Sequence, residues 1–155
     1  MSLITDEMRE LLGVDYPPTT YDVDKSAIRL WALAAGYTDP VFYDEDRAHR
    51  AGHPSLPAPP GFLGHERFGP EQDIGSKGPP IRGLNPRLTR SLNAGTEYEY
   101  LKAVYAGDVL VATTRIVDFQ ERVGSMGEML IISRETTYCR GDEPVAILRA
   151  KAINY

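Results

Sequence analysis

The final third of the sequence consists almost entirely of segments in which apolar and polar residues alternate, the pattern of antiparallel β-strands. Residues 96–101 alternate, 109–119 are rich in β-branched residues, and 128–139 and 145–153 flank a turn at 140–144. Turns as short as this one join neighbouring strands into hairpins. The sequence therefore predicts a β-meander, whose sheet has to bury one face against other parts of the protein.

A helix able to cover that face precedes the strands. Asp24 stands at an N-cap position, residues 26–35 are apolar on nearly every side apart from Arg29, and Gly36 provides the stop. A helix of this kind is expected to be covered on most sides by the sheet or by a partner chain. We expect Trp31 to anchor it in the core.

The middle of the chain is rich in proline and glycine. Most of the 12 prolines fall within residues 54–86, which disfavours long regular elements and leaves only 61–68 to fit a helix, of about two turns. We expect the whole segment 54–92 to be either a functional lid or pocket wall, or a flexible connection. A short strand at 16–23 and a surface helix at 44–51 complete the predicted elements, which together indicate an α+β domain.

Composition argues against several kinds of function. The 155 residues suit a single domain, 1–155, and the net charge of −5 offers no broad cationic surface for nucleic acid or an anionic membrane. No stretch approaches the roughly 20 apolar residues that span a bilayer, and the charged N-terminal segment is typical of a cytoplasmic protein. The single cysteine, Cys139, has no second cysteine for an internal disulfide. The spacing of histidines and glycines predicts neither a metal site nor a bound cofactor.

Five segments are informative through their order along the chain. They comprise residues 21–36, 38–44, 58–63, 92–100 and 105–108, followed by the predicted meander. This order resembles the MaoC-like dehydratases and enoyl-thioester hydratases, and in particular their N-terminal, non-catalytic type of domain. The resemblance covers most of the chain. It implies a single hotdog fold, in which an antiparallel β-meander sheet is wrapped around a central helix.

The hydratase motif of that family runs Gly-Asp-x-Asn-Pro-aliphatic-His, and its Asp and His form the acid/base pair that adds water to an enoyl thioester. Residues 36–42 of this chain keep the glycine, the proline and the aliphatic residue. Tyr37 stands at the position of the catalytic Asp, Asp39 at that of the Asn, and Phe42 at that of the catalytic His. Because each positioned acid or base contributes about 10²–10⁴ in rate, the resemblance implies a domain that has lost this chemistry.

Such a silent domain typically pairs with a second hotdog that retains the Asp and His, and helps to form the acyl tunnel. The resemblance then implies apolar wall residues, a helix N-terminus whose peptide N–H polarises the thioester carbonyl, and an arginine that faces the phosphates of CoA or a carrier protein. The substrate-binding residues implied in this way are Tyr37, Phe42, Pro60, Gly61, Phe62, Leu63 and Arg90. Core packing, an ordinary turn before a helix and a solvated loop charge are the alternative interpretations of the same residues.

Three functions remain open from the sequence. The first is the acyl-thioester-binding subunit of a 3-hydroxyacyl-thioester dehydratase or enoyl-CoA hydratase, with the Asp/His pair supplied by a second hotdog subunit in a homo- or heterodimer. The second is a standalone lyase or cyclase whose proton carriers are relocated to Asp39, His65 or a tyrosine, with Asp39 and His65 as the candidate catalytic residues. The third is a non-enzymatic protein that binds acyl-CoA or acyl-carrier thioesters for another enzyme.

Overall fold

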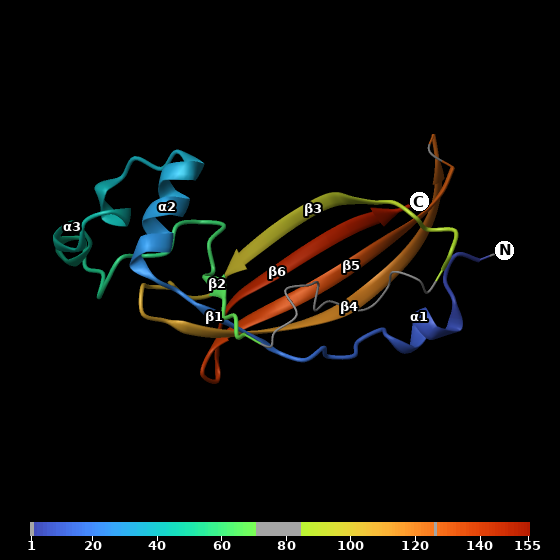
Figure 1. Cartoon of the computed structure of the whole chain (residues 1–155), viewed down its shortest axis with the longest axis horizontal. Coiled ribbons are helices and arrows are strands. Elements are labelled where there is room, and N and C mark those ends of the chain that lie inside the picture. The colour runs from blue at the N-terminus through green and yellow to red at the C-terminus, as the bar shows by residue number, and fades with distance from the viewer. Residues whose placement is uncertain (1, 71–84, 126) are drawn as a thin grey trace.

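The structure of the protein is a computed structural model that describes residues 2–70, 85–125 and 127–155. Six antiparallel strands form one sheet that curls along its length (Figure 1). In chain order the strands are β1 (Thr19–Asp22), β2 (His65–Glu66), β3 (Ser91–Tyr100), β4 (Val109–Gly124), β5 (Gly127–Arg140) and β6 (Glu143–Asn154). Their order across the sheet is β2-β1-β4-β5-β6-β3. The predicted α+β class is confirmed.

The three longest strands form the predicted meander. β4 pairs with β5, and β5 pairs with β6, each along most of its length. β3 departs from the prediction, because it pairs with β6 at the far edge of the sheet and not with β4, the next strand in the chain. Alternation identifies a strand but does not say which strand lies beside it. Residues 101–108 return the chain past β6 and β5 to the start of β4.

β1 is shorter than the strand predicted at 16–23. Tyr16 still lies beside β4, where its N–H donates to the Thr114 carbonyl oxygen at 2.9 Å. The next two residues are prolines, which have no N–H to donate, so the regular ladder begins only at Thr19. Tyr16 is therefore held next to β4 without belonging to a strand.

Four helical segments accompany the sheet: α1 (Asp6–Glu10), α2 (Lys25–Ala35), the 3-10 turn η1 (Pro40–Phe42) and α3 (Glu45–Arg50). α2 begins and ends as predicted, since the Asp24 carboxylate accepts a hydrogen bond from Ala27 N at 2.9 Å and Gly36 has a φ of 78°. α3 lies within the predicted helix at 44–51 and is capped by Asp44. None of the helices in the described residues is long and apolar enough to cross a membrane.

α2 is less covered by the sheet than its composition predicts. Ile28 is buried, but Leu30 and Leu33 are 66% and 71% exposed. The prediction that Trp31 anchors the helix in the core is wrong, because its side chain is 41% exposed and packs on Phe62 at the surface. The reason is the position of α2, which lies over one end of the sheet rather than along it (Figure 1). Its other side is left for solvent or a partner chain.

The prediction of a helix at 61–68 is wrong. Gly61 and Gly64 have φ angles of 89° and 96°, left-handed values that an α-helix does not contain. His65 and Glu66 instead form β2, which pairs with β1 at the edge of the sheet. Gly61, which was expected at the start of a helix, and Gly64 therefore turn the chain twice before it joins the sheet.

The proline-rich segment 54–92 is described only in part, because residues 71–84 lie outside the described residues. Within the described part, Ala58 N donates to the carbonyl oxygen of Val104 at 2.8 Å. Ala106 N donates to that of Leu56 at 2.9 Å. These bonds fix the first residues of the segment beside the chain that leads into β4.

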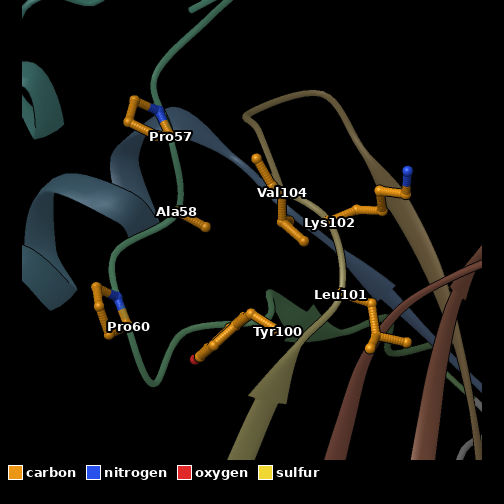
Figure 2. A pocket seen from close by; sticks show the side chains of 8 residues that line it. Pro57, Ala58, Pro60, Tyr100, Leu101, Lys102 and Val104 are labelled. Atoms are coloured by element: carbon orange, nitrogen blue, oxygen red, sulfur yellow. The ribbon is translucent and has the colours of Figure 1, made fainter.

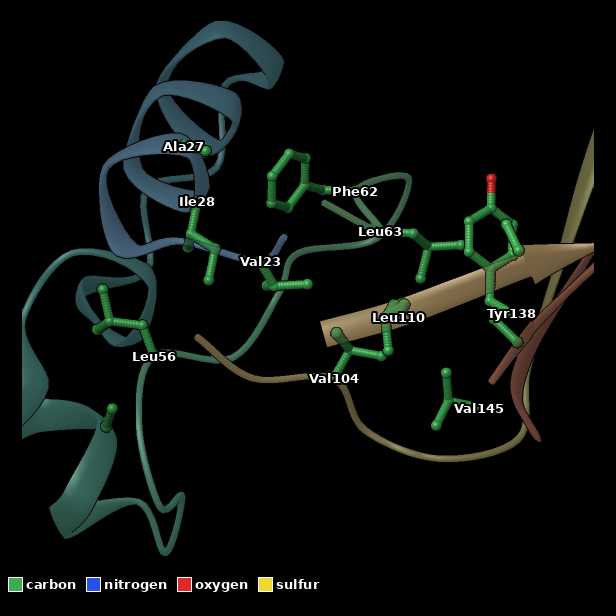
Figure 3. Close-up of a cluster of buried hydrophobic side chains, with 13 residues drawn as sticks. Val23, Ala27, Ile28, Leu56, Phe62, Leu63, Val104, Leu110, Tyr138 and Val145 are labelled. Carbon is green, nitrogen blue, oxygen red and sulfur yellow. The ribbon is translucent and has the colours of Figure 1, made fainter. Parts of the chain in front are cut away.

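Two clusters of buried apolar side chains form the core. The helical-end cluster comprises Val23, Ala27, Ile28, Ala48, Leu56, Phe62, Leu63, Val104, Leu110, Ala112, Tyr138, Val145 and Ala146 (Figure 3). The N-terminal cluster comprises Leu3, Met8, Ile116, Phe119, Leu130 and Ile132. Leu130, Ile132 and Tyr138 are even-numbered residues of β5, so both clusters lie on one face of the sheet, which we call the inner face.

Gly64 offers a test of how tightly β2 is held against β1. A Cβ added at Gly64 would lie 2.8 Å from the Asp22 carbonyl oxygen, at a φ of +96°. Gly52, which follows α3, has a φ of +89° but nothing within 4 Å of an added Cβ. We expect Gly64→Ala to lower the free energy of unfolding, measured in urea, by clearly more than the roughly 1–2 kcal/mol of Gly52→Ala. Equal losses would contradict this packing of β2.

Candidate functional site

A pocket of about 380 Å³ opens at the helical end of the sheet, between α2, the loop before β2, and strands β1, β3 and β5. Most of its lining is aromatic, and we call it the aromatic pocket. It is lined by Tyr21, Trp31, Gly61, Phe62, Leu63, Gly64, His65, Tyr98 and Tyr138. The Tyr21 and Tyr138 rings meet edge to face with their centroids 5.4 Å apart. Such a lining favours an apolar ligand that carries a few hydrogen-bonding groups.

A second pocket, of about 320 Å³, lies beside it. We call it the proline pocket; it is lined by Pro57, Ala58, Pro60, Tyr100, Leu101, Lys102, Ala103 and Val104 (Figure 2). Figure 2 shows the Tyr100 side chain reaching from the end of β3 toward the loop that contains Pro60. The two pockets therefore share the same loop on one side and the end of β3 on the other.

The Gly61 N–H, expected to polarise a thioester carbonyl, lies between the two pockets. It donates a hydrogen bond to the Tyr100 hydroxyl at 2.5 Å. A Cβ added at Gly61 would lie 3.2 Å from the Trp31 ring, so the backbone packs closely against that side chain. Because residues 61–68 form no helix, no helix dipole adds to the partial positive charge of this N–H group.

Two of the pocket tyrosines have pKa values above the ordinary value of a phenol. It raises the pKa of the Tyr138 phenol far above its usual range, and the neighbouring Tyr21 and Tyr98 raise it further. Burial also raises the pKa of Tyr100, against the opposing effect of the hydrogen bond from Gly61. Both phenols are therefore protonated at neutral pH, where they can donate hydrogen bonds but cannot serve as general bases.

Tyr37 and Phe42 lie together beyond the C-terminal end of α2, with their ring centroids 5.4 Å apart. Phe42 packs against the helical-end cluster, and the Tyr43 hydroxyl donates to the Tyr37 carbonyl oxygen at 2.6 Å. Neither residue lines the aromatic pocket or the proline pocket. The Tyr37 phenol is nevertheless near enough to Tyr100 to raise the pKa of that group. The two positions thus form an aromatic contact beside the pockets.

The structure gives Asp39 and His65 different partners. The Asp39 carboxylate accepts a hydrogen bond from Val41 N at 3.0 Å and caps η1, beyond the C-terminal end of α2. His65 Nε2 lies 3.5 Å from the Asp24 carboxylate, which caps the other end of α2, and its ring meets that of Phe62 edge to face. His65 therefore belongs to the aromatic pocket, and Asp39 belongs to the turn after α2.

The remaining predicted substrate-binding residues divide between the two ends of the sheet. Phe62 and Leu63 are buried in the helical-end cluster and line the aromatic pocket, and Pro60 lines the proline pocket. Arg90 immediately precedes β3, where its N–H and carbonyl groups pair with Tyr155. The length of β3, about 30 Å for a strand of this size, separates Arg90 from both pockets.

Sequence reasoning missed the tyrosines on β3 and β5 and the partner of His65. Tyr98 and Tyr100 stack with their centroids 6.0 Å apart, and their spacing of two residues was the signal that places them on one face of a strand. Asp24 is recognisable from the sequence only as a helix cap, since no spacing rule connects it with residue 65. Within the described residues, no three His, Cys, Asp or Glu side chains gather as metal ligands would.

Residues 10–148 match the family described as FAS1-like, dehydratase domain region. The UPF0336 protein of Streptomyces coelicolor is 31% identical to this chain over 118 residues, which cover 76% of this chain and 76% of that protein. The family match covers most of the chain, and the Streptomyces coelicolor protein is 31% identical to it. Both comparisons therefore show family membership.

Chains of two complexes from Mycobacterium tuberculosis have a similar fold. A chain of the ChsH1-ChsH2 complex has a TM-score of 0.77, covers 91% of this chain and 88% of its own length, and is 21% identical. A chain of the HadBC complex, a 3R-hydroxyacyl-ACP dehydratase, has a TM-score of 0.71 at 21% identity, with coverages of 97% and 99%. At these identities the likeness concerns the fold alone. The chain therefore belongs to the FAS1-like dehydratase-domain family and has the hotdog fold of the MaoC-like dehydratases.

Proposed function

We propose that this chain is the acyl-thioester-binding, non-catalytic subunit of a hydratase or dehydratase that acts on 2-enoyl or 3-hydroxyacyl thioesters. One observation carries the proposal. Tyr37 and Phe42 stand where the resembling family has its catalytic Asp and His, and both rings are engaged with each other. A phenylalanine ring has no titratable atom, so the acid/base pair has to come from a partner.

The two pockets supply the means of binding. The aromatic pocket offers apolar surface for an acyl chain, and the protonated phenols of Tyr100 and Tyr138 are hydrogen-bond donors. The Gly61 N–H lies between the pockets and is the group that would meet the thioester carbonyl. An acyl thioester would thus lie with its carbonyl at Gly61 and its acyl chain in the aromatic pocket.

The edge strand β3 is the expected contact with a second hotdog subunit. Every residue of β3 is exposed, and among the described strands only β6 pairs with it. Unpaired N–H and carbonyl groups on an edge strand readily pair with a strand of another chain. Because Tyr98 and Tyr100 lie on β3, a partner at this edge would close both pockets from that side. Both of the solved neighbours described above belong to complexes, which favours a heteromer.

The first test of this function compares the chain alone with the chain bound to a hotdog partner that carries the intact Asp/His motif. We expect hydration of an enoyl-CoA, followed as loss of absorbance of the conjugated thioester, to be at least about 10²-fold faster for the complex. A partner with its motif His replaced by Ala is the matched control and should remove the difference. Equal turnover by the isolated chain would contradict the proposal. Thioester binding without turnover by the complex would favour a non-enzymatic binding protein.

A second candidate function is a standalone lyase or cyclase. The observation that favours it is the contact of His65 with Asp24 at the wall of the aromatic pocket, since a carboxylate beside an imidazole is a recurring general-base arrangement.

Substitutions of the relocated residues separate the two functions. If the chain is the binding subunit, we expect His65→Ala and Asp39→Asn each to change turnover of the complex by less than about tenfold, because neither moves a proton in the reaction. His49→Ala, on the exposed surface of α3, is the matched control for loss of an imidazole. A fall of about 10²-fold or more in His65→Ala alone, with folding intact by circular dichroism, would establish the standalone enzyme instead.

A further inference from the structure

The centre of the inner face carries polar side chains between two apolar clusters. On β5, Ile132 belongs to the N-terminal cluster and Tyr138 to the helical-end cluster. Arg134 and Thr136 lie between these two residues on β5, and their even-numbered positions place them on the same face. The Thr136 hydroxyl lies 2.7 Å from that of Thr114 on β4. A charged group in such a position is costly unless it is paired, because burial removes it from water.

Arg134 and Tyr16 each hold a buried polar atom that lacks a partner. Arg134 Nε and the Tyr16 hydroxyl are buried, and neither forms a hydrogen bond within the part of the chain that the structure describes. Burial lowers the pKa of Arg134 and raises that of Tyr16. By contrast, Arg149 on β6 is paired with Glu99 at 2.8 Å. Buried polar atoms are rarely left unsatisfied in native proteins.

A pocket of about 280 Å³ opens beside Arg134. Ile132 and Ala150 contribute apolar surface to it, and Asn93 and Thr96 on β3 contribute polar groups. Ala150 on β6 pairs with Arg134 on the neighbouring strand β5 and with Thr96 on the other neighbouring strand, β3. A ligand in this pocket would meet the guanidinium group while the rest of it rests on apolar residues.

This pocket and the aromatic pocket lie along the same face of the sheet. Tyr138 lies four positions after Arg134 on β5, a distance of about 13 Å. On β3, Thr96 lines the pocket beside Arg134, and Tyr98 lines the aromatic pocket. Leu148 on β6 lies opposite Tyr98. An acyl chain that enters the aromatic pocket would therefore cross Leu148 and bring its far end to Arg134.

We propose that Arg134 binds a carboxylate at the far end of the acyl chain, so that the preferred thioesters carry a dicarboxylic acyl group. This inference rests on the proposed function and specifies its substrate class. A guanidinium–carboxylate pair forms strong, charge-assisted hydrogen bonds, and it would compensate the partly buried charge of Arg134 at the wall of this pocket. The apolar surface on the way suits the methylene groups of an acyl chain, and neither inorganic phosphate nor free CoA carries an acyl chain.

The test compares two acyl-CoA series of equal chain lengths, one ending in a methyl group and one in a carboxylate. Binding is measured by calorimetry with the full chain, alone and in complex with its motif-bearing partner. We expect the carboxylate-ended thioester to bind at least about tenfold more tightly than its methyl-ended match at one intermediate length, because a hydrogen bond to a charged group is among the stronger polar contacts. Inorganic phosphate and free CoA are not expected to compete at the carboxylate end.

Three variants identify the group responsible. Arg134→Met should remove the preference for the carboxylate, and Arg134→Lys should keep part of it. Arg115→Met is the matched control, because Arg115 is exposed on β4 and paired with Asp15 at 2.9 Å. Without ligand, Arg134→Met should unfold at a temperature no lower than the wild type, since replacing an unpaired, partly buried charge by an apolar side chain is seldom destabilising. If Arg134 instead stabilised the fold, Arg134→Met would unfold at a lower temperature than the wild type.

The outcomes separate the inference from the proposed function. If neither series binds, both the proposed function and the inference fail. If both series bind equally, or if Arg134→Met weakens them to the same extent, the inference fails and the proposed function stands. Displacement of the carboxylate-ended thioester by inorganic phosphate alone would also overturn the inference, because it would show a general anion site.

Discussion

Pairing among β4, β5 and β6 is the interaction on which the rest of the molecule depends. These strands place apolar side chains of both clusters on one face, and the N-terminal residues and the α2 region cover that face at its two ends. Within the described residues, the two buried clusters leave Arg134 and Thr136 between them at the centre of this face. The same sheet leaves β3 at an exposed edge beside the pockets. The proposed binding surface and the proposed subunit contact thus follow from how one sheet is covered.

Phe42 and the pocket tyrosines do not act as general bases at neutral pH, whereas His65 at the pocket wall is the base of the alternative function. Phe42 has no titratable atom, and burial raises the pKa values of the Tyr100 and Tyr138 phenols above the ordinary value. Such groups recognise and orient a ligand, and they do not drive addition of water. A chain of this composition fits the binding half of a two-part enzyme better than an enzyme complete in itself.

Much of the fold could be predicted from the sequence, because its signals are local. Asp24 and Gly36 mark the ends of α2 through capping, and alternation marks the strands of the meander. The place of β3 next to β6 could not be predicted, since strand order depends on long-range pairing. The same is true of Trp31, whose exposure is set by where α2 sits on the sheet.

The site was predicted less completely than the fold, for a related reason. Residues 60–63 could be placed at a pocket because they resemble a known segment, and the structure puts them there. The contact of His65 with Asp24 and the unpaired position of Arg134 arise from tertiary packing, which no spacing in the sequence records. Gly61 shows the limit most clearly, since it is compatible with a helix start but turns the chain instead.

The hydrogen bond from Gly61 N to Tyr100 has a further consequence for how a ligand is chosen. The phenol occupies the very donor that a carbonyl oxygen would use, so an incoming oxygen replaces one acceptor by another. Such an exchange leaves the number of hydrogen bonds nearly unchanged and contributes little net free energy. Discrimination among ligands must therefore come from shape and from contacts remote from the carbonyl. If a carbonyl ligand binds as proposed, it would displace the Tyr100 phenol from Gly61 at a similar cost whatever chain it carries.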